Sequence, residues 1–339
     1  MTDRASGRAW SAWVHGWRLV RTAPAIWIGV WVMTMVLAAP LAATMSGMIE
    51  RQLGGSTEAD SAADGVNWDW WQEFTSQSSG LGTTFTPQII GFAATLQNFS
   101  DFLDRTRVIE PVAGAVGLYL VTWIFVSGGI IDRYARQRAT RANGFFAASG
   151  VFFFRFLRLA VIAGMVFGLL FAWIQPWLLT RWFGAATANV DSERVVFAWR
   201  LLVYAIFGLL LAAADRVFTY ARIRMVIEDR LSATFAVVAA LRFLAGNARR
   251  VTVLYVLDAL TFAAALALWS GIAPGAPGGG ASVWLTFALM QIWIAARIAL
   301  KLHFIASETS LFQASLAHAG YTAAPLPAWP DSPAAEAIH

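Results

Sequence analysis

The chain has 339 residues, of which 58% are hydrophobic and only 13% are charged, and it contains no cysteine. An average soluble domain is about a quarter charged, so this composition excludes an ordinary soluble globule. It also excludes a disordered chain, which has too little apolar surface to offset the loss of chain entropy, and a disulfide-bonded scaffold. The class that remains is an all-α polytopic membrane protein.

Six apolar segments are each long enough to cross the hydrocarbon core of a bilayer, which takes about 20 residues. They cover residues 24–48, 111–131, 159–180, 195–214, 251–269 and 283–300. The first of them also resembles a signal peptide, but it is longer than the usual apolar region of one, and we expect it to be retained. We therefore predict a single six-span membrane domain over residues 1–315, with an outer loop at 49–110 and a flexible C-terminal tail at 316–339.

The basic residues indicate the orientation of the spans. All but one of the 25 Lys and Arg residues are arginine, and 19 of the 25 fall on the side of the two termini, against five on the opposite side. The positive-inside rule then places both termini in the cytoplasm. Arginines beside apolar segments also contact lipid headgroups, so we expect membrane lipids as partners and no nucleic acid.

A sequence pattern occurs three times along the chain. Residues 6–21 and 143–158 each place a small polar residue twelve positions before R-x-x-R, and a weaker copy begins at Ser232. Ser6, Asn143 and Ser232 are predicted N-caps, because their side-chain oxygens can accept backbone N–H bonds. We predict three repeated hairpins, each preceded by a cytoplasmic amphipathic helix that lies in the membrane interface or packs against the spans.

Arginines just outside the predicted spans are candidates for binding anionic headgroups. They are Arg18, Arg21, Arg155, Arg158, Arg242, Arg249 and Arg250.

Asp258 is the most specific candidate for a functional residue. It lies about 11 Å into the fifth predicted span, at 1.5 Å per residue. A charged aspartate at that depth costs about 2.5–3.5 kcal/mol, so it must face the interior, be protonated or have a partner. With Tyr255 one turn away, it forms either a site for a proton or a substrate headgroup, or a structural contact between helices. Both interpretations stay open.

Other carboxylates are expected to form ion pairs. Asp132 and Asp215 are each followed by an arginine, and Glu308 can pair with an arginine of the repeat. The segment Glu228-Asp229-Arg230 is expected to separate two cytoplasmic helices. The four histidines do not have the spacing of a zinc site, and the sequence contains no hydrolase or nucleotide-binding motif. We expect no catalytic residue, no metal and no cofactor.

The sequence Y-A-R-x-R follows the second and fourth spans, at residues 134–138 and 220–224. With the Glu228-Asp229-Arg230 segment and the span pattern, it resembles a broad group of poorly characterised bacterial six-span proteins. Similar regions form the membrane domain of some glycerophosphodiester phosphodiesterases. Their catalytic domain has no counterpart here, so the resemblance implies a membrane role and no catalytic residues.

Two functions follow as expectations. The first is a lipid-interacting or transport-related membrane protein without its own catalytic activity. The second is a scaffold or permease-like subunit of a larger complex, with a protein partner or a second copy of the chain.

Overall fold

The computed structural model describes residues 2–57, 59–63, 67–85, 110–274 and 281–316. Over these ranges the regular structure is helical throughout and contains no β-strand, so the predicted all-α class is confirmed. Residues 58, 64–66 and 86–109 of the predicted outer loop 49–110, and residues 317–339 of the predicted tail 316–339, lie outside the described residues.

The chain is a succession of long helices. They are α1 (Thr2–Arg21), α2 (Pro24–Leu53), α6 (Glu110–Arg136), α7 (Ala142–Leu169), α9 (Glu193–Ile227), α10 (Ala233–Ile272) and α11 (Ala281–Leu316). Between α7 and α9 the chain continues through the π-helical segments η2 (Leu170–Ile174) and η3 (Trp177–Trp182) into α8 (Phe183–Thr187). The segment after α2 contains α3 (Ala59–Ala63), α4 (Trp68–Gln77) and the 3-10 turn η1 (Gly80–Thr84).

Within the described residues, six helices are long and apolar enough to span a membrane. They cover Pro24–Leu53, Val112–Arg136, Ala142–Thr187, Glu193–Ile227, Ala233–Ile272 and Ala281–Leu316. Each overlaps one of the six predicted segments, in the same order. Large apolar side chains on them are exposed, including Trp173, Leu209 and Trp284. Extensive exposed apolar surface suits hydrocarbon rather than water as the surrounding solvent, and the chain is accordingly a membrane protein.

The chain divides into two compact units, each assembled from separated stretches of sequence. Unit 1 comprises Met1–Gly16, Trp123–Leu254 and the chain from Ile305 onward. Unit 2 comprises Trp17–Thr122 and Tyr255–Phe304. Helices α1, α6, α10 and α11 therefore contribute one part to each unit.

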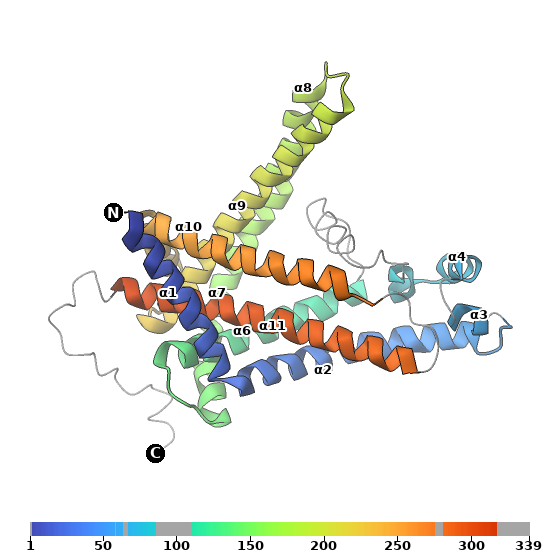
Figure 1. Cartoon of the computed structure of the whole chain (residues 1–339), viewed down its shortest axis with the longest axis horizontal. Helices are drawn as coiled ribbons and strands as arrows, with labels where there is room; N and C mark the ends of the chain where they lie inside the picture. Colours follow the sequence, from blue (N-terminus) through green and yellow to red (C-terminus); the bar gives the residue numbers. More distant parts are fainter. Residues whose placement is uncertain (1, 58, 64–66, 86–109, 275–280, 317–339) are drawn as a thin grey trace. The chain divides into compact units, whose positions relative to one another are not determined.

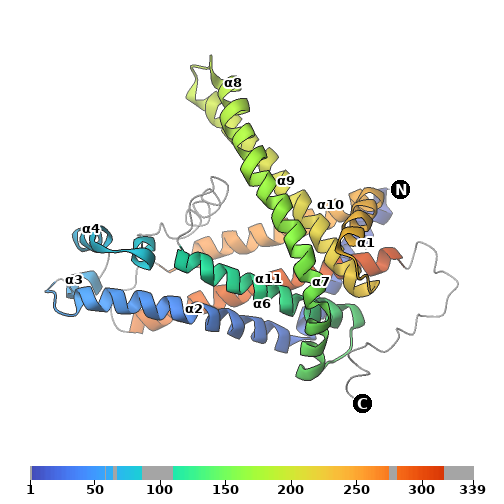
Figure 2. The same ribbon diagram turned by 180° about the vertical axis from the view of Figure 1, so that it is seen from behind.

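Unit 1 contains a long antiparallel hairpin, in which α7 and its continuation to α8 lie beside α9 (Figures 1 and 2). Its buried aromatic core joins α9, α10 and α11, because the ring of Phe243 lies 5.2 Å from that of Tyr220 and 4.9 Å from that of Phe312. Helices α6 and α7 approach closely at Gly128 and Gly129. A Cβ on Gly129 would lie 2.5 Å from the Ser149 hydroxyl, so only glycine fits there.

Unit 2 gathers parts of α2, α6, α10 and α11. The indole N–H of Trp27 on α2 donates to the carbonyl of Ala295 on α11 at 2.7 Å. On α6, the Tyr119 hydroxyl lies 3.3 Å from the ammonium of Lys301. Helix α10 joins them through Trp269, whose ring stacks on that of Trp293 at 5.0 Å.

The three predicted amphipathic segments meet their spans in three different ways. Helix α1 ends at Arg21 and α2 begins at Pro24, so the first segment is a separate helix. The second runs into its span within the continuous helix α7. The third is joined to its span across a kink at Asn247, where φ is −123° and ψ is 19°. The threefold repeat itself stays a prediction.

Two predicted N-caps are wrong. Ser6 lies inside α1, and Asn143 lies inside α7, which begins at Ala142 with Arg141 as its N-cap. The helices begin earlier than the pattern indicated, because residues of ordinary helix propensity extend them by one or more positions. Ser232, by contrast, directly precedes the first residue of α10, as predicted.

Candidate functional site

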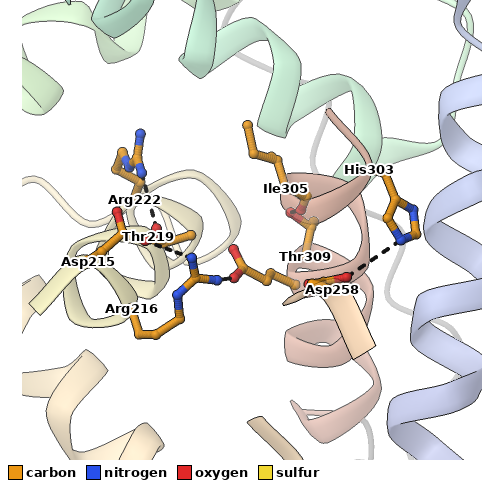
Figure 3. A network of polar contacts seen from close by, with 9 residues as sticks. Asp215, Arg216, Thr219, Arg222, Asp258, His303, Ile305 and Thr309 are labelled. Carbon is orange, nitrogen blue, oxygen red and sulfur yellow. Dashed lines mark hydrogen bonds and ion pairs between the residues drawn. The ribbon is translucent and has the colours of Figure 1, made fainter. Parts of the chain in front are cut away.

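Asp258 is buried in unit 2 and faces a histidine. Its side chain points from α10 toward α11, where His303 Nε2 lies 3.5 Å from its Oδ1 (Figure 3). Asp258 is 2% exposed and His303 is fully buried. Asp258 therefore fulfils the expectation of an inward-facing residue with a partner, and the partner is His303.

An indole covers one face of this histidine. The Trp17 ring, near the end of α1, stacks on the His303 imidazole with ring centroids 4.2 Å apart and an angle of 14° between the planes. Three helices thus hold the imidazole: α11 carries it, α10 presents a carboxylate to its edge and α1 covers its face.

Such a pair can hold a proton between a carboxylate and an imidazole, or it can fix two helices to one another. Ionisable residues inside membrane spans mark proton and substrate routes, and they also serve as structural contacts. Tyr255, predicted to assist Asp258, lies one turn before it and is half-buried. Its role stays a prediction.

The seven candidate arginines fall into two groups. Arg18, Arg21, Arg158, Arg242 and Arg249 are exposed. Arg155 and Arg250 are half-buried and engaged by protein groups: Arg155 binds the carboxylate of Asp229, and Arg250 Nη1 donates to Asn247 Oδ1 at 3.1 Å. The first group is available to a ligand, whereas the second contributes to the packing of unit 1.

The carboxylates expected to form ion pairs do so. Asp132 pairs with Arg136 one turn on, at 2.6 Å. Asp215 lies 2.7 Å from the guanidinium of Arg216. The same guanidinium binds the buried carboxylate of Glu308 on α11. Arg216 therefore joins α9 to α11 within unit 1. Arg216 lies outside the repeated segments, so the ion pair of Glu308 forms with a different arginine from those predicted.

A second arginine on α9, Arg222, lies one and a half turns from Arg216. Its Nη2 donates to the hydroxyl of Thr219 at 3.1 Å (Figure 3). Both arginines thus have polar partners on their own helix, as buried or half-buried guanidinium groups require.

The Glu228–Arg230 segment separates α9 from α10, as predicted. Glu228 accepts from Arg224 Nη2 at 2.7 Å and also binds Arg230, while Asp229 binds Arg155 of α7. Asp229 has a φ of 48°, in the left-handed region that ends helices. The two carboxylates are bound by three arginines and hold this connection against α7.

Sequence reasoning missed two members of the buried site, His303 and Trp17. The spacing of the four histidines addresses only a metal site, and the sequence pattern does not distinguish Trp17 from the other tryptophans. The available signal was the cost of burying Asp258, which favours a hydrogen-bonding or ionic partner for its carboxylate. His303, just beyond the predicted sixth span, was a candidate for that role.

No protein-family model matches this chain, and neither a curated protein nor a solved structure matches it.

Proposed function

We propose that this is an integral protein of the bacterial cytoplasmic membrane that binds anionic phospholipids through arginines at the cytoplasmic ends of its spans. In this proposal both termini lie in the cytoplasm. The observation that supports it is the exposure of Arg18 and Arg21 in unit 2, and of Arg158, Arg242 and Arg249 in unit 1. Carboxylates of unit 1, by contrast, are bound to other arginines.

The expected strength of this interaction is considerable. A basic residue close to an anionic membrane surface contributes about 1 kcal/mol of attraction, so several exposed arginines together give a strong preference for anionic lipid. This attraction acts over about one Debye length, which is about 8 Å at physiological ionic strength. The arginines adjoin the apolar segments directly, within reach of the phosphates.

The test is the composition of the lipids that the protein retains. Reconstituted in equal amounts of phosphatidylglycerol and phosphatidylcholine and re-extracted, the full chain should retain an excess of phosphatidylglycerol by mass spectrometry. Replacing Arg18, Arg21, Arg242 and Arg249 with glutamine should lower that excess several-fold, because each guanidinium contributes separately. The matched variant with lysine at these positions keeps the charge and should keep the excess. Equal retention of the two lipids by the unaltered protein would overturn the proposal.

A second candidate function is transport, and the Asp258–His303 pair favours it. A buried carboxylate and imidazole at 3.5 Å can accept and release a proton within the helices of unit 2. A scaffold or permease-like subunit, with a protein partner or a second copy of the chain, is the remaining proposal. Kinship with the membrane domain of glycerophosphodiester phosphodiesterases is likewise a proposal, on the sequence resemblance alone.

A further inference from the structure

An open groove of about 540 Å³ lies in unit 1, between α7 and the residues that lead into α10. One wall is formed by Arg158, Val161 and Ile162, which share a face of α7 because they are three and four positions apart. The other includes Leu231, Ser232 and Thr234. The groove is therefore amphiphilic, with a guanidinium and two hydroxyls beside three aliphatic side chains.

Arg158 makes the polar part of the groove cationic. It is exposed, and its Nε donates to the backbone carbonyl of Phe154 at 3.3 Å. Among the described residues no carboxylate forms an ion pair with it. Glu228 and Asp229, on the connection that borders the groove, are already bound by other arginines. The guanidinium of Arg158 is therefore available to an anion.

Two hydroxyls face the same space. The side-chain oxygens of Ser232 and Thr234 lie 3.1 Å apart where α10 begins. Hydroxyl groups donate to phosphate oxygens, and the first backbone N–H groups of a helix have no acceptor within it. The guanidinium of Arg158 provides the principal attraction for a phosphate, and the hydroxyl and N–H donors orient that phosphate in the groove.

An apolar track continues from the groove along α7. Val161, Met165 and Leu169 are four residues apart, so they form one stripe, and their exposed fractions are 59%, 57% and 57%. The stripe lies within the third predicted span, and Arg158 directly precedes that span. A ligand that fits both parts has an anionic head and a hydrocarbon chain.

We propose that the groove binds one anionic phospholipid molecule. Its phosphate lies against Arg158 and the hydroxyls of Ser232 and Thr234, and one acyl chain follows Val161, Met165 and Leu169. Guanidinium suits this role because it binds phosphate oxygens in pairs, which an ammonium group does not. The inference rests on the proposed function, since it assigns one discrete site to the lipid class named there.

The experiment is native mass spectrometry of the delipidated full chain in mild detergent, titrated with phosphatidylglycerol. We expect one adduct that forms well before the others. Arg158→Gln should weaken it about tenfold, because hydrogen bonds to a charged group are lost. Arg158→Lys should weaken it less. Arg138→Gln, the matched control, removes an exposed arginine of unit 1 that does not line the groove and should change the first adduct less than twofold.

Two further ligands identify the chemistry. Phosphatidylcholine, which carries no net charge, should bind about tenfold more weakly than phosphatidylglycerol. Glycerol 3-phosphate has the anionic head without acyl chains and should compete only at much higher concentration, because the apolar track contributes nothing to its binding. Competition equal to that of the lipid would identify a site for soluble phosphate compounds and overturn the inference.

The outcomes separate this site from the general proposal. If the unaltered protein shows no preference for phosphatidylglycerol, the proposed function fails and the groove with it. If the preference persists but Arg158→Gln behaves like Arg138→Gln, the groove inference alone fails. Should Arg158→Gln misfold by gel filtration or thermal unfolding, the double variant Ser232→Ala, Thr234→Ala, which removes only the hydroxyl donors, should still weaken the first adduct measurably. An unchanged adduct in that variant would overturn the inference.

Discussion

Asp258 and His303 show how far the properties of a single residue could be predicted. The cost of a carboxylate within an apolar span predicted that Asp258 faces the interior, is protonated or has a partner, and the residue is 2% exposed with its carboxylate 3.5 Å from His303. The identity of the partner could not be predicted, because several polar residues that follow the fifth span in the sequence were possible partners. The relative rotation of α10 and α11 decides which one meets the carboxylate, and sequence periodicity does not determine that rotation.

A double-mutant cycle measures the pair. Asp258→Ala should lower the free energy of unfolding by about 1–3 kcal/mol, because it leaves the imidazole buried without its carboxylate. The coupling between Asp258→Ala and His303→Ala should be about 0.6–1.7 kcal/mol, as for polar contacts between membrane helices. Chemical unfolding in mild detergent measures both quantities. Thr44→Val is the control, because the exposed Thr44 hydroxyl donates to the carbonyl of Pro40 on its own helix. This substitution should change the free energy of unfolding little. A coupling of zero would show that the two side chains do not interact.

The same pair distinguishes a structural contact from a proton site. Proteoliposomes with an imposed potassium potential and a trapped pH-sensitive dye report proton flux. If the pair carries protons, the unaltered protein should conduct and Asp258→Asn should reduce the flux at least tenfold, because the amide cannot take up a proton in this pH range. Asp258→Asn keeps the shape and polarity of the side chain, so its fold should be preserved. Equal flux through both proteins would leave the pair a structural contact and exclude the transport candidate.

At the scale of helices, composition located the centres of the spans but not their ends. The third predicted span covered residues 159–180, whereas the helical structure runs over Ala142–Thr187. Hydrophobicity marks the part of a helix that hydrocarbon can surround, and the helix continues wherever its backbone bonds are satisfied. The kink at Asn247 was not predicted either. At the kink the Asn247 side chain donates to the backbone carbonyl of Phe243 and accepts from Arg250, and sequence periodicity does not reveal such contacts.

The close approach of α6 and α7 provides a matched pair of glycines. Gly129→Ala should lower the free energy of unfolding by about 1–3 kcal/mol, because its Cβ would meet Ser149 and the backbone of Phe145 at 2.5 and 2.8 Å. Gly117→Ala, on the same helix, meets nothing within 4 Å and should be neutral or stabilise by up to about 1 kcal/mol through helix propensity. Thermal unfolding in detergent compares them. Similar effects at both positions would contradict the contact between α6 and α7.

At the scale of the whole chain, composition predicted a membrane protein of six apolar helices, and the structure confirms both. The division into two compact units was not foreseen. Each unit combines stretches that lie far apart in the sequence. Contacts of this kind, such as that of Trp27 with Ala295, depend on the shapes of particular side chains rather than on average hydrophobicity, so patterns in one sequence do not predict them.

The natural absence of cysteine makes the orientation easy to test. Single cysteines replace Gly55, after α2, and Ala139, between α6 and α7; both positions are exposed. If the termini are cytoplasmic, a membrane-impermeant maleimide should label Gly55→Cys in intact cells and Ala139→Cys only after permeabilisation. Permeabilised cells provide the control, since both variants should then react. The reverse pattern would invert the proposed topology.

The assembly of unit 1 from separated stretches of sequence has a consequence for biosynthesis. Phe312 and Glu308, which complete its aromatic core and bind Arg216, come from the last described helix. Until that helix leaves the ribosome, a nascent chain already holding α7 and α9 lacks both groups, and the Arg216 guanidinium lacks one of its carboxylates. We therefore expect chains truncated before residue 305 to be degraded by membrane quality-control proteases, even though all six predicted apolar segments would be present.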